Sequence, residues 1–161
     1  MVEILDHSEL NDKLIQKIIE FKNLSWEHSY ESHLEWLNTN LQRGDLHFFY
    51  LESSILVGYM NLVRIAVDID NKPIPFWGIG NVCTKYKGKG DGLKLMQQVN
   101  KFLLSTSSKG ILFCKKSLIP FYSKCNWIQI KNLHPNSDSN TFVFNYLPKE
   151  FYNLRFNDRL F

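Results

Sequence analysis

The sequence has only three cysteines among its 161 residues, and no two of them form a CxxC arrangement. An odd number of widely spaced cysteines predicts neither a disulfide framework nor a structural zinc site. Cys83, Cys114 and Cys125 lie in apolar segments, so we expect them to be buried as small hydrophobic side chains. No metal is expected.

Long apolar runs and a strong charge bias are also missing. No stretch approaches the roughly 18 apolar residues that cross a bilayer, and no basic segment precedes an apolar one near Met1. We therefore expect a cytoplasmic protein with no membrane partner. The formal net charge is a mild +3, and the lysines cluster at 85–89 and 115–116. This local basic patch argues against nucleic-acid binding and favours a small polyanionic ligand.

No internal repeat, low-complexity tract or flexible linker divides the chain. Apolar residues make up 44% of the sequence and aromatic residues 14%, which is enough for a packed core. The length is typical of one domain, so we predict a single domain over residues 1–161.

Hydrophobic spacing predicts the main elements. Leucines and isoleucines at helical intervals predict a helix that begins at a capping box of Asp6 and Glu9. Ser25 is expected to cap a second helix, which ends at Gly44. Strands are predicted at 46–52, 55–67, 74–84, 110–115, 127–131 and 141–146, and helices at 93–103 and 117–125.

This order of elements predicts a mixed α/β fold. The sheet is expected to have about six to seven mostly antiparallel strands, flanked by helices. The unit from Ile74 to Lys115 should form one parallel strand–helix–strand crossover. The tail from Lys149 to Phe161 matches no element pattern.

A basic, glycine-rich loop lies between a predicted strand and a predicted helix. It reads Lys87-Gly88-Lys89-Gly90-Asp91-Gly92. A helix N-terminus leaves backbone N–H groups unpaired and carries partial positive charge, and glycine lets the backbone approach a phosphate closely. We therefore expect the loop to bind a pyrophosphate. Its spacing fits neither a Walker loop nor the dinucleotide fingerprint G-x-G-x-x-G.

The segment 82–96 reads V-C-T-K-Y-K-G-K-G-D-G-L-K-L-M. It resembles the acetyl-CoA signature of the GCN5-related N-acetyltransferase (GNAT) superfamily, [QR]-x-x-G-x-[GA]. Gly90 and Gly92 take the two small positions, and Tyr86 takes the aromatic position before them. Lys87 stands where the family has glutamine or arginine and keeps a hydrogen-bond donor. Asp91 stands at a commonly apolar position and is expected to point away from the pyrophosphate or to cap the helix.

A second segment, 112–127, reads L-F-C-K-K-S-L-I-P-F-Y-S-K-C-N-W. It resembles the strand, the short helix and the F-Y-x-K-x-G-[FW] ending of the same superfamily. Phe121, Tyr122 and Trp127 fall at matching positions, and Asn126 replaces the usual glycine. Both residue types tolerate the left-handed conformation that ends a helix. Lys115 falls roughly where many members carry an asparagine that contacts pantetheine.

The resemblance implies an acetyl-CoA-dependent N-acetyltransferase without a metal. It implies direct transfer of acetyl to the amine of a small molecule such as an amino sugar, an aminoglycoside or a polyamine. Backbone at 82–84 would pair with pantetheine and polarise the thioester carbonyl, and Tyr122 would act as general acid. The implied cofactor contacts are Val82, Cys83, Thr84, Lys87, Gly88, Lys89, Gly90, Asp91, Gly92, Leu93 and Lys115.

The general base is left open. Many family members have a glutamate on the strand before the signature, but 76–82 contains no carboxylate. Asn81 is a candidate to hold a water that accepts the proton. The other candidates are Glu27, Glu31, Glu35, His28, His33 and His47. An amine of low pKa would need no base.

The first two helices border the acceptor site in this superfamily. The expected acceptor contacts are Trp26, Tyr30, Glu31 and Trp77. Glutamates at 27, 31 and 35 would form an anionic wall for a cationic amine, although a solvated helix face explains the same spacing. His28 and His33 are five residues apart, so they are not expected to share a helix face or a metal.

Two other functions stay open. The chain could bind acyl-CoA without catalysis, as a sensor or accessory module, or bind another phosphate ligand without any preference for CoA. The sequence also leaves open whether the protein is a monomer or a homodimer.

Overall fold

The computed structural model describes residues 1–130, 138–146, 155–156, 159 and 161. Hydrogen bonds link eight strands in the order β1-β2-β3-β4-β5-β7-β6, and β8 pairs with β3. Residue contacts group the chain into two compact units that share the long strands β3 (Ile55–Ile69) and β4 (Lys72–Thr84). The first unit contains residues 1–63, 80–95 and Phe161, and the second contains the described residues of 64–79 and 96–159.

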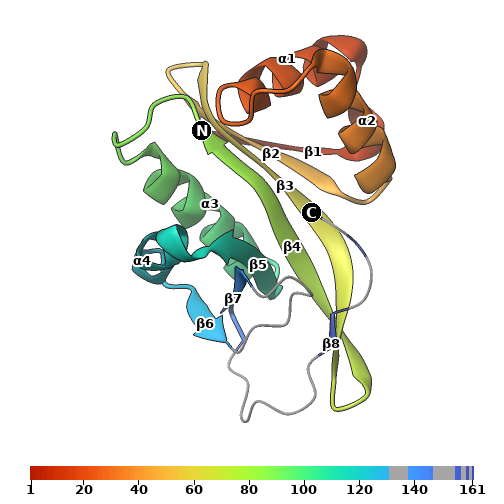
Figure 1. Cartoon of the computed structure of the whole chain (residues 1–161), viewed down its shortest axis with the longest axis vertical. Helices are drawn as coiled ribbons and strands as arrows, with labels where there is room; N and C mark the ends of the chain where they lie inside the picture. Colours follow the sequence, from red (N-terminus) through yellow and green to blue (C-terminus); the bar gives the residue numbers. More distant parts are fainter. Residues whose placement is uncertain (131–137, 147–154, 157–158, 160) are drawn as a thin grey trace. The chain divides into compact units, whose positions relative to one another are not determined.

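The first unit begins with strand β1 (Val2–Asp6) and a 3-10 turn, η1 (His7–Glu9). Two helices follow, α1 (Asp12–Asn23) and α2 (Tyr30–Asn40), and they pack together beside β1 and β2 (Leu46–Glu52) (Figure 1). Strand β2 pairs antiparallel with β1 on one side and with β3 on the other. The buried core of this unit includes Ile18, Ile19, Leu37, Phe48, Tyr59, Met60 and Leu62.

The second unit holds most of helix α3 (Asp91–Ser105) and the later strands. After β5 (Gly110–Lys115) come a 3-10 turn, η2 (Lys116–Leu118), helix α4 (Ile119–Lys124), β6 (Ile128–Ile130), β7 (Ser139–Phe144) and β8 (Arg155–Phe156). Strand β4 runs parallel to β5, with Trp77 opposite Gly110 and Gly78 opposite Ile111. Strand β7 pairs antiparallel with both β5 and β6.

A close contact fixes the start of β5. A Cβ atom at Gly110 would lie 2.6 Å from the ring of Trp127, so only glycine leaves room for the indole. The indole Nε1–H of Trp127 donates to Oδ1 of Asn100 at 2.9 Å, and Nδ2 of Asn100 donates to the carbonyl of Cys125 at 2.9 Å. These buried hydrogen bonds connect α3 to the end of α4.

The predicted mixed α/β fold is confirmed. The sheet is mostly antiparallel, and the strand–helix–strand unit around α3 gives its parallel pair. The described residues contain two strands that the sequence pattern did not predict, β1 and β8. Strand β1 was missed because its burial does not alternate, and β8 has only two residues.

Two predicted helix starts are wrong. The capping box of Asp6 and Glu9 is present, but it caps the 3-10 turn η1, and Asn11 caps α1 instead. The N-cap of α2 is Ser29, whose hydroxyl accepts from the N–H of Ser32 at 3.1 Å, and not Ser25. Trp26 and His28 therefore lie in the loop before α2.

Other local predictions are confirmed. The three cysteines are free and buried, and Asn126 adopts the left-handed conformation with φ 64°. Residues 134–137 of the predicted turn and most of the tail lie outside the described residues, whereas Ser139 and Asn140 already belong to β7. Within the described part of the chain, no helix combines the length and apolar character that a membrane span needs.

Candidate functional site

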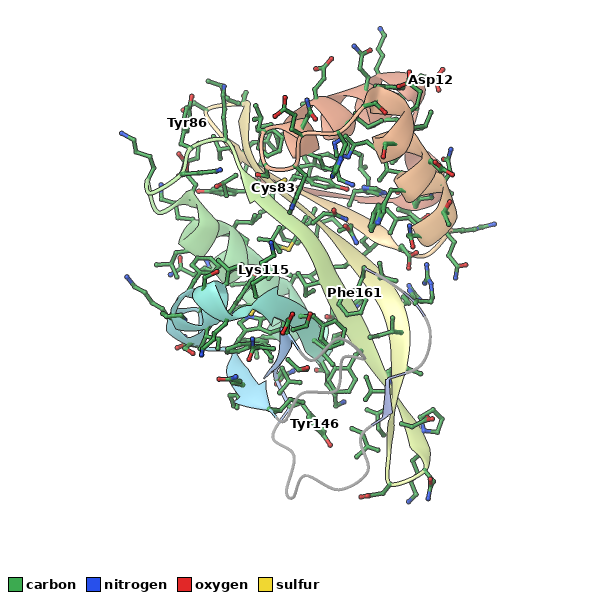
Figure 2. All side chains as sticks on the ribbon, viewed as in Figure 1. Asp12, Cys83, Tyr86, Lys115, Tyr146 and Phe161 are labelled. Atoms are coloured by element: carbon green, nitrogen blue, oxygen red, sulfur yellow. The ribbon has the colours of Figure 1, made fainter. Side chains whose placement is uncertain are left out.

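The glycine-rich loop joins β4 to α3 and lies in the first unit. Figure 2 labels Tyr86 on this loop. Gly88 and Gly90 have φ angles of +75° and +84°, a region that favours glycine. No atom lies within 4 Å of a Cβ added at either position. The backbone N–H of Lys85 donates to the carbonyl of Val57 at 2.9 Å and ties the loop to β3. The loop backbone is thus anchored on one side and open to a ligand on the other.

The charged side chains of the loop are arranged for an anion. Lys87 and Lys89 are exposed and make no ion pair with any described residue. Asp91 is buried, and its Oδ1 lies 3.7 Å from the ammonium of Lys94, which also donates to Glu52 at 2.7 Å. The carboxylate at the first position of α3 is therefore balanced by Lys94 and by the helix N-terminus. The free lysines leave the loop with a positive face.

The backbone of β4 is distorted just before the loop. Asn81 has φ 50° inside the strand, and a left-handed residue there redirects the neighbouring N–H and C=O groups. Cys83 is 3% exposed, and burial raises the pKa of its thiol to about 12. The thiol is therefore protonated at neutral pH and is a poor nucleophile. The role predicted for 82–84 rests on backbone groups and does not require the Cys83 thiol.

The side chain of Asn81 is held by a second asparagine. Its Nδ2 donates to Oδ1 of Asn61, which is fully buried on β3. Nδ2 of Asn61 has no hydrogen-bond partner among the described residues. Oδ1 of Asn81 accepts no hydrogen bond from the part of the chain that the structure describes, and Asn81 lines a pocket.

This pocket has a volume of about 260 Å³ and lies within the first unit. Its walls come from α1, from the loop before α2, from α2 and from β4. The lining residues are Lys22, Trp26, His28, Ser32, His33, Trp36 and Asn81. None of these lining residues is acidic. Of the residues named as candidates from the sequence, the pocket brings together Trp26, His28, His33 and Asn81.

Lys22 is the charged residue of the pocket. It is 2% exposed, and its Nζ lies 4.2 Å from the centroid of the Trp36 ring. Its ammonium makes no hydrogen bond or ion pair with any described residue. Burial lowers the pKa of its ammonium from 10.5 to about 8, and Cys83 raises it slightly. At neutral pH the group is mostly protonated, so the pocket contains an unpaired cation over an aromatic ring.

Two histidines adjoin this lysine. Nε2 of His33 lies 3.0 Å from the carbonyl oxygen of Trp26, so Nε2 carries the proton and donates it. Burial lowers the pKa of His33, with Lys22 and His28 acting in the same direction. The rings of His28 and His33 meet edge to face with centroids 5.6 Å apart. His28 precedes α2, so the two histidines do not share a helix face, but the loop brings the ring of His28 against that of His33.

The predicted anionic wall does not line this pocket. Glu27, Glu31 and Glu35 are exposed, as is Tyr30, whose side chain is 43% accessible. Glu31 and Glu35 therefore lie on an exposed face of α2, and Glu27 is exposed in the loop before it. His47 does not line the pocket either: it is buried, its two ring nitrogens contact His7 at 2.9 Å and Tyr59 at 2.8 Å, and burial lowers its pKa to about 3.

Trp77 lies in the second unit, in a different pocket of about 350 Å³. The guanidinium of Arg64 lies 5.1 Å from the centroid of its ring. Trp77 is not among the residues that line the pocket around Lys22.

Tyr122 and Lys115 also belong to the second unit. Tyr122 lies on α4 between the rings of Phe121, 4.9 Å away, and Phe142, 5.9 Å away. Burial raises the pKa of its phenol well above the ordinary 10. Its hydroxyl makes no hydrogen bond with the described residues, so a protonated donor is available there. Lys115 ends β5 and is exposed (Figure 2).

Sequence reasoning missed Lys22, Ser32 and Asn61. Lys22 did carry a signal, because it continues the stripe of Ile15, Ile18 and Ile19 at helical spacing. A lysine on the buried face of a helix is a candidate functional group. Asn61 carried no comparable signal, since a polar residue within a strand is often simply exposed.

Comparison with known proteins finds no matching family model and no matching curated sequence. Solved structures do match. An acyl-CoA N-acyltransferase from Pseudomonas aeruginosa is 14% identical with a TM-score of 0.65, covering 89% of this chain and 98% of that one. The aminoglycoside 6'-N-acetyltransferase from Enterococcus faecium is 13% identical with a TM-score of 0.65, covering 93% and 99%. The Campylobacter jejuni N-acetyltransferase PseH in complex with acetyl coenzyme A is 17% identical with a TM-score of 0.59, covering 89% and 98%.

These matches extend over nearly the whole chain at low identity, so they establish the fold. The chain has the fold of the acyl-CoA N-acyltransferases, the GNAT superfamily that its two motifs resemble. Its acceptor is not defined by this likeness, because the matched enzymes differ among themselves.

Proposed function

We propose that this protein is an acetyl-CoA-dependent N-acetyltransferase that acts on the amine of a small molecule. The observation that carries the proposal is the loop between β4 and α3. It combines left-handed glycines at Gly88 and Gly90 with a helix N-terminus and the unpaired lysines Lys87 and Lys89. Such an arrangement suits a pyrophosphate, and it stands in the fold of the acyl-CoA N-acyltransferases.

Bound acetyl-CoA would supply the activated acetyl group as a thioester. The loop 87–93 would hold its pyrophosphate, with Lys115 as a further contact. The backbone of Val82, Cys83 and Thr84 would pair with the pantetheine arm, because the distortion at Asn81 redirects these peptide groups. A backbone N–H near Val82 would stabilise negative charge on the carbonyl oxygen during transfer.

Tyr122 would donate a proton to the leaving thiolate. Its raised pKa keeps the phenol protonated throughout the neutral range, and no described residue competes for its hydroxyl. A buried thiolate is itself more basic than a solvated one, which favours the proton transfer.

The pocket around Lys22 would receive the acceptor. Oδ1 of Asn81 accepts a hydrogen bond from the amine or from a water, since Nδ2 is engaged by Asn61. His28 and His33 are the candidate bases from the sequence that line this pocket. The lowered pKa of His33 leaves it neutral above about pH 6.5 and able to accept a proton.

The test is a screen of small amines for thiol release from acetyl-CoA, with Tyr122→Phe as the mechanistic control. We expect Tyr122→Phe to lower kcat by roughly 10²-fold or more while the affinity for acetyl-CoA changes little. Tight acetyl-CoA binding without turnover of any amine would favour the alternative, a non-catalytic acyl-CoA sensor. An unchanged kcat in Tyr122→Phe would remove Tyr122 from the mechanism.

A further inference from the structure

The pocket of the first unit contains an unpaired buried cation. Lys22 is 2% exposed, and its described contact is the face of the Trp36 ring at 4.2 Å. An ammonium has three N–H donors, and an aromatic face satisfies them poorly. Buried charges in proteins are normally paired with a counter-charge, because burial without one is costly. The counter-charge of Lys22 is absent from the described residues.

The lining of the pocket has the polarity that suits an anion. Ser32 adds a hydroxyl, His28 adds an imidazole, and no carboxylate lies among the lining residues. The nearest glutamates in sequence, at 27, 31 and 35, are exposed. A cationic ligand would therefore meet an ammonium without a compensating acid. A ligand with a carboxylate or phosphate would complete an ion pair and replace the missing hydrogen bonds.

We propose that the acceptor is an amine that also carries an anionic group, and that Lys22 binds this anion beside Trp36 while Asn81 accepts a hydrogen bond from the amine. This inference rests on the proposed acetyltransferase function and specifies its acceptor. Polyamines and aminoglycosides, which carry several positive charges and no anion, are then poor acceptors. Amino acids and phosphorylated amino sugars have the required pair of groups.

The size of the pocket agrees with this class. Its volume of about 260 Å³ lies below the ~300–1,000 Å³ of pockets that bury drug-sized ligands. One amino acid or one sugar ring is of the appropriate size, whereas an aminoglycoside of several rings would extend outside. Trp26 and Trp36 supply flat apolar walls for the body of such a ligand.

The lowered pKa of Lys22 gives further support. At about 8 it leaves the ammonium mostly charged at neutral pH, and an anion bound beside it would raise that pKa again. The energetic cost of the buried charge is thus recovered when the ligand binds, which is a common property of sites that select a charged substrate.

The experiment compares two matched pairs of probes by calorimetry at pH 7. One pair is glucosamine 6-phosphate and glucosamine, and the other is phenylalanine and phenylalaninamide. We expect the member that carries the phosphate or carboxylate, in at least one pair, to bind about tenfold or more tightly than the partner that lacks this group. A preference in the first pair alone identifies a phosphate-bearing acceptor, and a preference in the second alone identifies a carboxylate. Equal affinity within both pairs, or no binding of either anionic probe, would overturn the inference.

The variant Lys22→Met provides the control, because methionine keeps the length of the side chain and removes its charge. In this variant the preference within the pair should disappear, while acetyl-CoA affinity stays at the wild-type level and shows that the fold is intact. A preference that survives in Lys22→Met would also overturn the assignment. Acetyl-CoA titration of the same samples tests the proposed function separately, since it does not depend on the pocket lining.

Discussion

The ammonium of Lys22 on α1 lies 4.2 Å from the centre of the Trp36 ring on α2. Both side chains line one pocket of the first unit, and the lysine is almost completely buried. A charge held in this way lowers the stability of the fold, so its presence indicates a use. Removing the charge should therefore raise the stability of the fold and weaken the binding of an anionic ligand.

We predict that Lys22→Met stabilises the folded protein at pH 7 by about 1–3 kcal/mol. The folded pKa of about 8 lies below the ordinary value of 10.5, so the unfolded chain binds more protons between these two values. The stability of the wild type should consequently rise with pH across this window, relative to Lys22→Met. Urea unfolding of both proteins at pH 7 and pH 10 measures the difference. A variant that is less stable at pH 7 would show that Lys22 is not an unpaired charge.

His47 should make the protein sensitive to acid. Burial lowers its pKa from 6.5 to about 3. Between pH 6.5 and pH 3 this histidine is therefore protonated in the unfolded chain and neutral in the folded chain. Stability is complete above pH 6.5 and should fall on acidification, by about 2 kcal/mol at pH 5 from this group alone.

The variant His47→Gln tests this account, since glutamine retains a donor and an acceptor for His7 and Tyr59. Urea midpoints measured from pH 7 to pH 5 should fall less in His47→Gln than in the wild type. The variant His28→Gln is the matched control, because His28 is exposed. Its urea midpoint should change with pH as that of the wild type does. Parallel pH dependence in His47→Gln and the wild type would refute the role of His47.

Gly90 should affect ligand binding more than folding. Its φ of +84° strains any residue with a Cβ, but apart from the adjoining residues no described atom lies within 4 Å of the added methyl. We predict that Gly90→Ala costs about 1 kcal/mol of stability and weakens acetyl-CoA by about tenfold or more, because the methyl would occupy the open side of the loop. Calorimetry and urea unfolding separate the two effects.

Asn126→Ala is the control for backbone strain. Asn126 is also left-handed, with φ 64°, but it lies at the end of α4 in the second unit. It should lose similar stability without a change in acetyl-CoA affinity. If both variants bound acetyl-CoA like the wild type, the loop at Gly90 would not be the pyrophosphate site.

The sequence predicted those parts of the molecule whose signals are local. The loop around Gly90 follows from glycines at positive φ, and the end of α4 follows from Asn126, which is left-handed as expected. Hydrophobic spacing placed β5 at its observed bounds because the strand is short, apolar and flanked by turn residues. Strand β1 was not predicted, because its side chains do not alternate between buried and exposed positions.

The acceptor pocket could not be predicted in the same way, because tertiary packing assembles it. Ser25 and Ser29 are both acceptable caps by residue type, and choosing the wrong one placed Trp26 and His28 on a helix they do not belong to. The glutamates of α2 suggested a cationic acceptor, whereas the burial of Lys22 indicates an anionic group on it. Only the burial of each side chain distinguishes a solvated charge from a functional one.

The most direct test of the central claim is a calorimetric titration of the purified protein with acetyl-CoA, with CoA and ATP as controls. The account predicts micromolar binding of acetyl-CoA and CoA, and much weaker binding of ATP. Absence of binding by acetyl-CoA and CoA would contradict the account, and the loop between β4 and α3 would then be a turn or a site for another phosphate.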